Sequence, residues 1–471
     1  STLSSSSAAS DVYKRQADER GGLARLAAFR GGFDAEAART VAGVSEATLD
    51  RLVARSLVAD DGDARFDLHP VVAAYAQEKL DEVPEGARAA LAERHARHYG
   101  AVVAAQDARY HGPHQTEAAL RLEQEHANVA AAIAWARAHA PEAALRMAGD
   151  LRRYWRYAGR FAEGREVAER ALAAAAGASA AAGETPLEAR VAARVAAGAM
   201  AYRLGDLGAA RAHLRTALDE ADALGGEGAD AGAWQALGDV AYADRALDEA
   251  ETCFAAAMRS AKVREDDVAE GAAVTAEGRL AARRRDFATA RARFERARVL
   301  SERRGDAAGA ASANFNLASV ARDVGDLTAA EERYGRALAI DTEVGDRWGI
   351  AACLHELAAV VYLRGEHAAA ERRFREARRI CRAIGDAPGV AGAEHGLGLV
   401  AFAEGRLELA ARCQGAALRA WLDLGQEVRT GRVLWALARI ADAAGRTEIA
   451  ARLWGAEAAV KERHGQRDAG S

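Results

Sequence analysis

Small and apolar residues recur every forty positions through the C-terminal half of the chain. Glycine holds one phase of this period at Gly205, Gly325, Gly365, Gly405 and Gly445, and Arg245 and Arg285 fill the two gaps. Alanine follows five residues later in every unit, from Ala210 to Ala450. A second glycine series, from Gly225 to Gly465 and broken only by Glu265, marks the far end of each unit. A fixed period of this length is typical of a solenoid of stacked units.

Each forty-residue unit predicts two amphipathic helices. In the unit of Gly325 we expect one helix over 307–324 and a second over 326–344. Asp206, Asp326 and Glu366 directly follow a turn glycine, where an acidic side chain can cap the second helix. Helices of about eighteen residues are about 27 Å long. The pattern predicts an array of seven units over 186–465, followed by a tail over 466–471.

The same pattern resembles the tetratricopeptide repeat. The resemblance is carried by small residues at Gly198, Gly238, Ala318, Ala358, Gly398 and Ala438, and by large ones at Phe254, Phe294, Tyr334 and Phe374. Two departures are a unit longer than the usual 34 residues and alanine at the usual tyrosine position of the first helix. The resemblance implies an all-α fold, a right-handed α-solenoid of helix pairs whose first helices line a concave groove.

Polar and aromatic residues of the first helices are the candidate ligand contacts. The side chains that we expect to project into the groove are Gln235, Asp239, Tyr242, Arg279, Arg283, Phe315, Asn316, Ser319, Arg322, His355, Glu356, Tyr362, His395 and Trp435. A mixture of aromatic, amide and charged groups favours a protein, a peptide or a small-molecule effector as the partner. Each one alone could equally be a solvated or core helix residue.

A different pattern occupies residues 17–85. Apolar spacing predicts helices over 23–29, 33–41 and 49–57, with Ser45 as N-cap of the third. The acidic turn 60–63 separates two short apolar runs, which predicts a hairpin or wing. His69 and Pro70 then open a last helix over 71–80.

Three runs in this segment, LAAFRGGFDAEAA, DRLVARSLV and FDLHPVVAAYAQEKL, resemble the winged-helix domain of NB-ARC-type signal-transduction ATPases, the STAND class. The resemblance implies that His69 can approach nucleotide phosphates, although it can equally cap a helix. A winged helix also suggests DNA binding, but residues 17–83 carry eight basic and thirteen acidic side chains. Because a surface that faces phosphates needs excess cations, we expect no direct contact with nucleic acid.

Residues 86–142 predict a helical bridge, with helices over 87–108 and 116–139. The run EQEHANVAAAIAWA resembles a segment that precedes the repeats in bacterial regulators of the same class. Histidines gather here at His95, His98, His111, His114 and His126. No cysteine or compact carboxylate set accompanies them, so we interpret them as surface residues and expect no metal. Residues 143–185 predict a divergent first repeat around Gly159, with AGASAAAGETP as a long loop.

The composition and the missing motifs exclude several classes of function for this chain. The net charge of −5 leaves no polybasic field for nucleic acid or an anionic membrane. Cys253, Cys353, Cys381 and Cys413 form no C-x-x-C pair and are interpreted as buried thiols in a reducing compartment. The sequence contains no run of eighteen apolar residues and no G-x-x-x-x-G-K-[ST], H-E-x-x-H or G-x-S-x-G motif. We therefore expect a cytoplasmic protein without cofactor or catalytic residues.

The first sixteen residues, STLSSSSAASDVYKRQ, are serine-rich, and SAASDVYKRQ resembles a translated sequencing adapter. We expect the natural protein to begin further upstream. The leading hypothesis is that the chain is the sensor arm of a bacterial ATPase regulator, similar to LuxR-type and antibiotic-regulatory activators, with its ATPase core upstream. The alternative is a self-contained repeat scaffold that joins two proteins. An enzyme within these residues is a third hypothesis.

Overall fold

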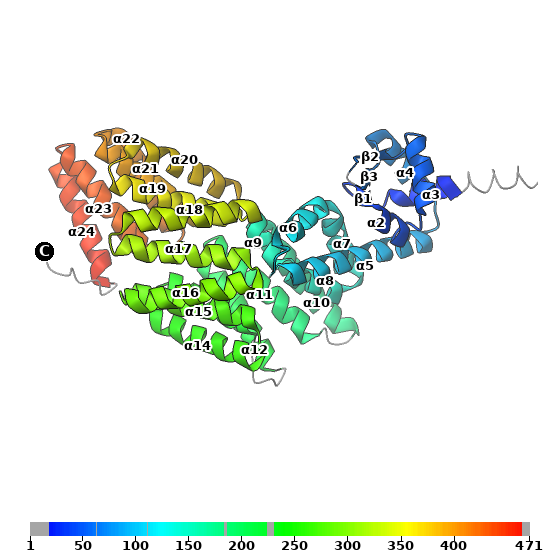
Figure 1. Cartoon of the computed structure of the whole chain (residues 1–471), viewed down its shortest axis with the longest axis horizontal. Coiled ribbons are helices and arrows are strands. Elements are labelled where there is room, and N and C mark those ends of the chain that lie inside the picture. Colours follow the sequence, from blue (N-terminus) through cyan, green and yellow to red (C-terminus); the bar gives the residue numbers. More distant parts are fainter. Residues whose placement is uncertain (1–17, 63, 111, 183–185, 224–229, 464–471) are drawn as a thin grey trace, which may run out of the picture. The chain divides into compact units, whose positions relative to one another are not determined.

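The computed structural model describes residues 18–62, 64–110, 112–182, 186–223 and 230–463. It divides into two compact units, drawn in sequence colours in Figure 1. The first unit, here the N-terminal unit, contains residues up to 108, 120–150 and 170–189. The second, here the array unit, contains residues 109–119, 151–169 and those from 190 onward. The predicted leader 1–16, His111, Gly225, Gly465 and the tail 466–471 lie outside the described residues.

The N-terminal unit begins with a helix over 18–26, followed by α2 (Ala35–Thr40), α3 (Glu46–Ala54) and α4 (Pro70–Asp81). A small antiparallel sheet accompanies them, in the order β1 (Phe33–Asp34), β3 (Arg65–Asp67), β2 (Ala59–Asp60). Ser45 caps α3 as predicted, because its hydroxyl accepts from the Thr48 amide. The prediction that Phe33 is helical is wrong. Asp34 caps α2 with extended backbone, which leaves Phe33 in a strand opposite Phe66.

Four helices continue the chain: α5 (Glu85–Arg109), α6 (Gln115–Gln124), α7 (His126–His139) and α8 (Pro141–Asp150). The predicted single helix over 116–139 is wrong, because it is interrupted at Glu125, whose carboxylate enters a buried polar network. The surface assignment of His95 is also wrong, since only 5% of this residue is exposed. Burial lowers its pKa to about 4, so its imidazole is neutral near pH 7.

The divergent repeat consists of α9 (Arg152–Ala158) and α10 (Phe161–Ala182), joined at Gly159. Gly159 has a positive φ of 69°, and a side chain there would overlap Ile384. Both observations require glycine at this turn. The loop predicted for AGASAAAGETP is shorter than expected, because α10 continues through Ala182.

The array consists of helix pairs. Their bounds are α11 (Leu187–Arg203), α12 (Leu207–Asp222), α13 (Ala231–Ala243), α14 (Leu247–Val263), α15 (Asp267–Arg283), α16 (Phe287–Arg304), α17 (Ala307–Asp323), α18 (Leu327–Val344), α19 (Arg347–Leu363), α20 (His367–Ala383), α21 (Ala387–Ala403), α22 (Leu407–Asp423), α23 (Glu427–Ala443) and α24 (Thr447–Arg463). The odd-numbered helices from α11 to α23 are here called helices A, and the even-numbered helices from α12 to α24 are helices B. The pair α17 and α18 falls within one residue of the predicted bounds. Figure 1 shows successive helices packed side by side.

The contact between the two helices of a repeat explains its small residues. A Cβ atom built on Gly238 would lie 2.5 Å from Cδ1 of Phe254, and one on Gly278 would lie 2.6 Å from Cε1 of Phe294. Phe254 and Phe294 are both 1% exposed. The large residue of helix B therefore occupies the space that a side chain on helix A would need.

The turns between helices require left-handed backbone. Gly205, Gly325, Gly365, Gly405 and Gly445 have positive φ values between 71° and 91°. The residues that replace glycine in the two series adopt the same conformation: Arg245 at 62°, Glu265 at 53° and Arg285 at 63°. A residue with a Cβ atom is strained in this region by about 1 kcal/mol or more. The repeat geometry thus imposes glycine's conformation even where glycine is absent.

Caps and thiols complete the array. Asp206 and Asp326 cap α12 and α18 by accepting from backbone amides at 2.9 and 3.0 Å, as predicted. Glu366 occupies the corresponding position of α20 but makes no capping bond, which corrects the prediction. The four cysteines are free thiols and all are buried. None of the helices in the described part of the chain is both long and apolar enough to cross a membrane.

Candidate ligand-binding site

The array unit curls until its first repeat meets its last ones. A Cβ atom on Gly205 would lie 2.7 Å from Leu424 Cδ2 and 3.2 Å from Pro388 Cγ. These contacts join the turn between α11 and α12 to residues of α21 and the turn after α22. The helix A faces therefore surround an interior space, here called the lumen.

A pocket of about 300 Å³ lies in this lumen. It is lined by residues of helix pairs along the array, the first and the last included, among them Tyr202, Arg203, Phe315, Trp348, His355, Glu356, Trp421 and Arg429. This volume is at the lower end of the range found for small-molecule pockets. Of the groove residues predicted from the sequence, Phe315, His355 and Glu356 line this pocket.

The prediction missed other residues of the lining, among them Arg203, Trp348, Trp421 and Arg429. Trp348 and Arg429 lie in the first turn of a helix A, and Arg203 lies at the end of one. The predicted set contains no residue from the first turn of a helix A, which is where Trp348 and Arg429 lie. Arg203 stands two repeats before the predicted groove residue Arg283, at the equivalent position, and this was the signal available in the sequence.

Charged members of the predicted groove are largely paired with one another. Arg279 forms an ion pair with Asp239, and Arg322 forms one with Glu356. Gln235 donates to Asp239 at 3.3 Å. These groups hold neighbouring helices A together across the repeats, which is a structural role that does not require a ligand.

The uncharged members also have protein partners. Ser319 Oγ and the Tyr334 hydroxyl are 2.9 Å apart, and the Asn316 amide donates to a carbonyl of its own helix. His395 Nδ1 lies 2.8 Å from Gln414 Oε1. The remaining members make ring contacts: Tyr242 with Arg279 and Arg283, Tyr362 with His367, and Trp435 with Arg439. Trp435 is 43% exposed and lies outside the pocket lining.

Two arginines in the pocket lie over tryptophan faces. The Arg203 guanidinium carbon is 4.0 Å from the Trp348 ring centre, and that of Arg429 is 4.7 Å from the Trp421 ring centre. Neither arginine has an ion-pair partner among the described residues. Surrounding protein lowers the pKa of each guanidinium, first by limiting its hydration. Stacking leaves the N–H groups at the guanidinium edge free to bind an oxyanion.

Residues 109–119 and α9 pack against the B-to-A turns of the array. The Gln115 amide donates to the Tyr110 carbonyl at 2.6 Å and to Asp306 Oδ1 at 2.7 Å, and it accepts from the Ala308 amide at 3.0 Å. Gln115 is 2% exposed. Two of its three bonds, to Asp306 and Ala308, attach this segment to the start of α17. The sequence pattern gave no signal for this contact, since it joins positions almost two hundred residues apart.

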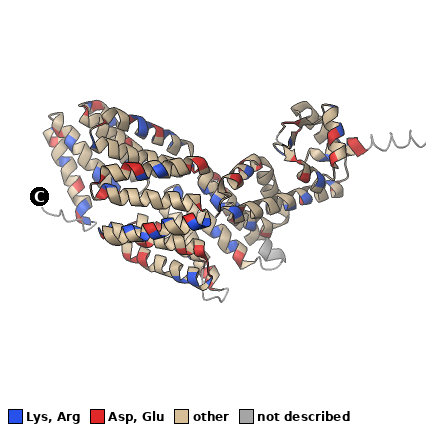
Figure 2. Ribbon diagram, in the orientation of Figure 1, with Lys and Arg blue, Asp and Glu red and all other residues tan. Residues whose placement is uncertain are grey.

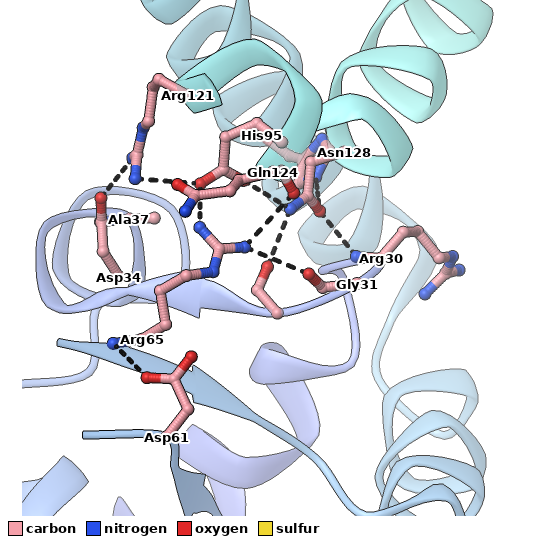
Figure 3. Close-up of polar contacts among 12 residues, drawn as sticks. Arg30, Gly31, Asp34, Ala37, Asp61, Arg65, His95, Arg121, Gln124 and Asn128 are labelled. Atoms are coloured by element: carbon pink, nitrogen blue, oxygen red, sulfur yellow. Dashed lines mark hydrogen bonds and ion pairs between the residues drawn. The ribbon is translucent and has the colours of Figure 1, made fainter. Parts of the chain in front are cut away.

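The N-terminal unit contains a buried polar network, shown in Figure 3. Glu125 and Asn128 are fully buried. Glu125 pairs with Arg65 at 2.5 Å and with Arg121 at 3.2 Å. Asn128 accepts from the Arg30 amide at 2.6 Å and donates to the Gly32 carbonyl at 2.8 Å. Every one of these groups is satisfied by protein, so the network binds the sheet region to α6 and α7 and leaves no ligand site.

His69 is exposed and caps α4, because its Nδ1 atom accepts from the Val71 amide at 3.4 Å. The described residues contain no group of three His, Cys, Asp or Glu side chains arranged to hold a metal ion. Basic and acidic residues are interspersed along the helices of the array in Figure 2. The candidate site is therefore the lumen pocket.

Comparison with known proteins agrees with this architecture. The tetratricopeptide repeat family model matches residues 309–383. An alignment of 146 positions is 41% identical to the "Putative HTH-type transcriptional regulator Rv0890c" of Mycobacterium tuberculosis, and it covers 28% of this chain and 16% of that protein.

One solved structure has a similar fold, and a second aligns over most of this chain with a lower score. A Rap protein complexed with competence and sporulation factor has a TM-score of 0.57 at 12% identity and covers 79% of this chain and all of that one. A STAND protein with a tetratricopeptide repeat sensor, PH0952 from Pyrococcus horikoshii, has a TM-score of 0.48 at 13% identity and covers 95% of this chain and 64% of that one. The chain is an all-α solenoid that contains tetratricopeptide repeats.

Proposed function

We propose that the chain is the ligand-binding sensor arm of a larger bacterial signal-transduction regulator, and that its ligand is a peptide held in the lumen. The observation that carries the proposal is the lumen pocket, where aromatic rings and two arginines without ion-pair partners among the described residues meet in one concave site. Binding there can favour one arrangement of the array over another. Such a ligand controls a regulator only if it binds the two states with different affinity.

The similarity to a mycobacterial transcriptional regulator supports a role in regulation. The Rap structure is of a protein complexed with competence and sporulation factor, which supports ligand binding by an array of this fold. The matched segment is a small part of the mycobacterial protein, so an ATPase core and a DNA-binding domain remain part of the proposal. Sequencing the genomic DNA upstream of codon 17 tests them. An in-frame G-x-x-x-x-G-K-[ST] is expected, and a start codon immediately upstream would contradict the proposal.

We also propose that the chain binds and does not catalyse, and that it acts in the cytoplasm. Cys381 and His355 both line the pocket, but burial raises the pKa of the thiol and lowers that of the imidazole. A protonated thiol is a poor nucleophile. The purified chain is therefore expected to hydrolyse neither ATP nor peptide esters.

The binding proposal can be tested on the full chain. Selection from a displayed heptapeptide library is expected to enrich peptides, and calorimetry would then give the Kd of an enriched sequence. Phe315→Ala removes an aromatic wall of the pocket, and we expect it to weaken binding at least tenfold. Leu422→Ala is the matched control, because Leu422 is 58% exposed and absent from the pocket lining. No enrichment, or equal binding by both variants, would refute the proposal.

A further inference from the structure

Arg245, Arg283, Arg429 and Arg432 lie close enough for their charges to repel one another, and Arg203 lines the same pocket as Arg429. These five residues are here called the arginine cluster. Arg203 and Arg429 line the lumen pocket, and Arg432 follows Arg429 by one helical turn. Arg245 follows Asp244, which lines a second pocket together with Gln426. None of the five forms an ion pair with a residue in the described part of the chain.

Three of the acidic side chains nearby are already engaged. Asp239 pairs with Arg279, and Glu356 pairs with Arg322. Asp386 caps α21 by accepting from the Gly389 amide at 2.9 Å. The whole chain carries a net charge of −5, so an excess of cations at this one place runs against its composition. The array therefore concentrates positive charge that it does not neutralise itself.

Arg245 is the member of the cluster whose backbone conformation and charge are least favourable for the stability of the free protein. Five other repeats place glycine at its position, and its φ of 62° strains an arginine backbone. Its pKa is lowered to about 10, first by burial and then by repulsion from three other members of the cluster. Arg245 is thus unfavourable both locally and electrostatically in the free protein. Residues that break a local rule without compensation concentrate at functional sites.

We propose that the arginine cluster binds the carboxylates of an acidic peptide that enters the lumen. The inference rests on the proposed function and adds the chemical class of the ligand. Guanidinium groups bind carboxylates in a bidentate manner, and Arg203 and Arg429 are held for this purpose by their tryptophans. The cations come from separate elements of the array: the end of α11, the turn after α13, the end of α15, and α23. Such a spread suits an extended chain with several carboxylates better than one compact anion.

The test uses the full chain and three probes measured by calorimetry. The first is a nine-residue peptide in which Glu alternates with Ser, the second is the same peptide with Gln in place of Glu, and the third is inorganic pyrophosphate. We expect the Glu peptide to bind at least tenfold more tightly than the Gln peptide, with an affinity that falls as salt increases. Pyrophosphate is expected to bind more weakly than the Glu peptide.

Arg245→Gly and Arg285→Gly form a matched pair of variants. Both replace an arginine of positive φ by the glycine of other repeats, so both are expected to unfold at a higher temperature than the wild type. Arg285 is exposed and is not part of the cluster. We expect Arg245→Gly to weaken binding of the Glu peptide five- to tenfold and Arg285→Gly to leave it within twofold. A loss of binding with a gain in stability separates a ligand contact from misfolding.

A second pair tests the pocket itself. Arg203→Gln with Arg429→Gln is expected to weaken binding of the Glu peptide at least fiftyfold. Arg412→Gln with Arg419→Gln removes the same charge from exposed positions of α22 and is expected to change it less than twofold. Equal losses in both double variants would overturn the inference, because they would indicate general charge attraction.

Three further results would also overturn it. Arg245→Gly and Arg285→Gly could bind the Glu peptide equally, or pyrophosphate could bind more tightly than the peptide. In the third, Phe315→Ala weakens peptide binding but the Glu peptide and the Gln peptide bind equally well. That result refutes the acidic ligand and leaves the proposed function standing. Binding of no peptide at all would refute both.

Discussion

Asp341 is a buried carboxyl group whose replacement by asparagine should stabilise the array at alkaline pH. The residue is 6% exposed and lies on α18 against the first turn of α19. The Cys353 thiol donates to its Oδ2 atom at 3.5 Å. Burial raises its pKa to about 7, and the negative charge of Asp346 adds to the effect. An asparagine side chain would keep the shape of the aspartate without the charge.

The magnitude follows from the difference between the ordinary pKa of 3.8 and the value of about 7 in the folded protein. This difference corresponds to roughly 4 kcal/mol. Between these two pH values the unfolded chain has lost the proton and the folded chain retains it. The contribution of Asp341 to stability is therefore complete below about pH 4 and is lost as the pH rises to about 7. Above that pH the folded protein carries a buried charge.

The assay is urea unfolding of the wild type and of Asp341→Asn at about pH 4 and about pH 8.5. We expect similar stability near the lower pH and an advantage of about 2 to 4 kcal/mol for Asp341→Asn at the higher one, the lower figure allowing for unsatisfied amide protons. Glu343→Gln is the control, because Glu343 is exposed on the same helix, and its stability should follow the wild type at both pH values. A difference between wild type and Asp341→Asn that does not change with pH would refute the reasoning.

Other substitutions test the remaining features. Glu265→Gly should stabilise the array by up to about 1 kcal/mol by relieving a positive φ of 53°, and no change in the urea midpoint would contradict the strain argument. Glu125→Gln should lower the free energy of unfolding by about 3 kcal/mol, because the Arg65 charge loses its buried partner. An unchanged urea midpoint would show that the network contributes little to stability. Gly278→Val should cost at least about 1 to 3 kcal/mol through overlap with Phe294, and a smaller loss would mean that the helices can separate. The four buried thiols should react with a disulfide reagent only in urea, and rapid reaction of the folded chain would contradict their burial.

The repeat pattern was sufficient to predict the local structure of the array. Phase-matched small residues located α17 and α18 within one residue, and even Arg245, Glu265 and Arg285 adopt the conformation of the glycines they replace. These features depend on contacts between neighbours in the sequence, which a periodic pattern records directly.

Contacts between distant repeats could not be predicted in the same way. The approach of Gly205 to Leu424 results from many small rotations between successive helix pairs, and no single position encodes their sum. The pocket residues Trp348 and Arg429 were missed for this reason, since they meet only after the array has curled. The break at Glu125 was missed because its cause is a partner sixty residues away, Arg65.

The meeting of Gly205 with Leu424 and Pro388 has a mechanical consequence. An open solenoid extends like a spring, because each unit touches only the units beside it. Here the turn after α11 packs against residues of α21 and the turn after α22, so a change in the pitch of the array must widen or narrow the contact between these turns. A ligand in the lumen would then change the spacing of all repeats together. Repeats that are far from the ligand would move with it, without a series of local rearrangements between them.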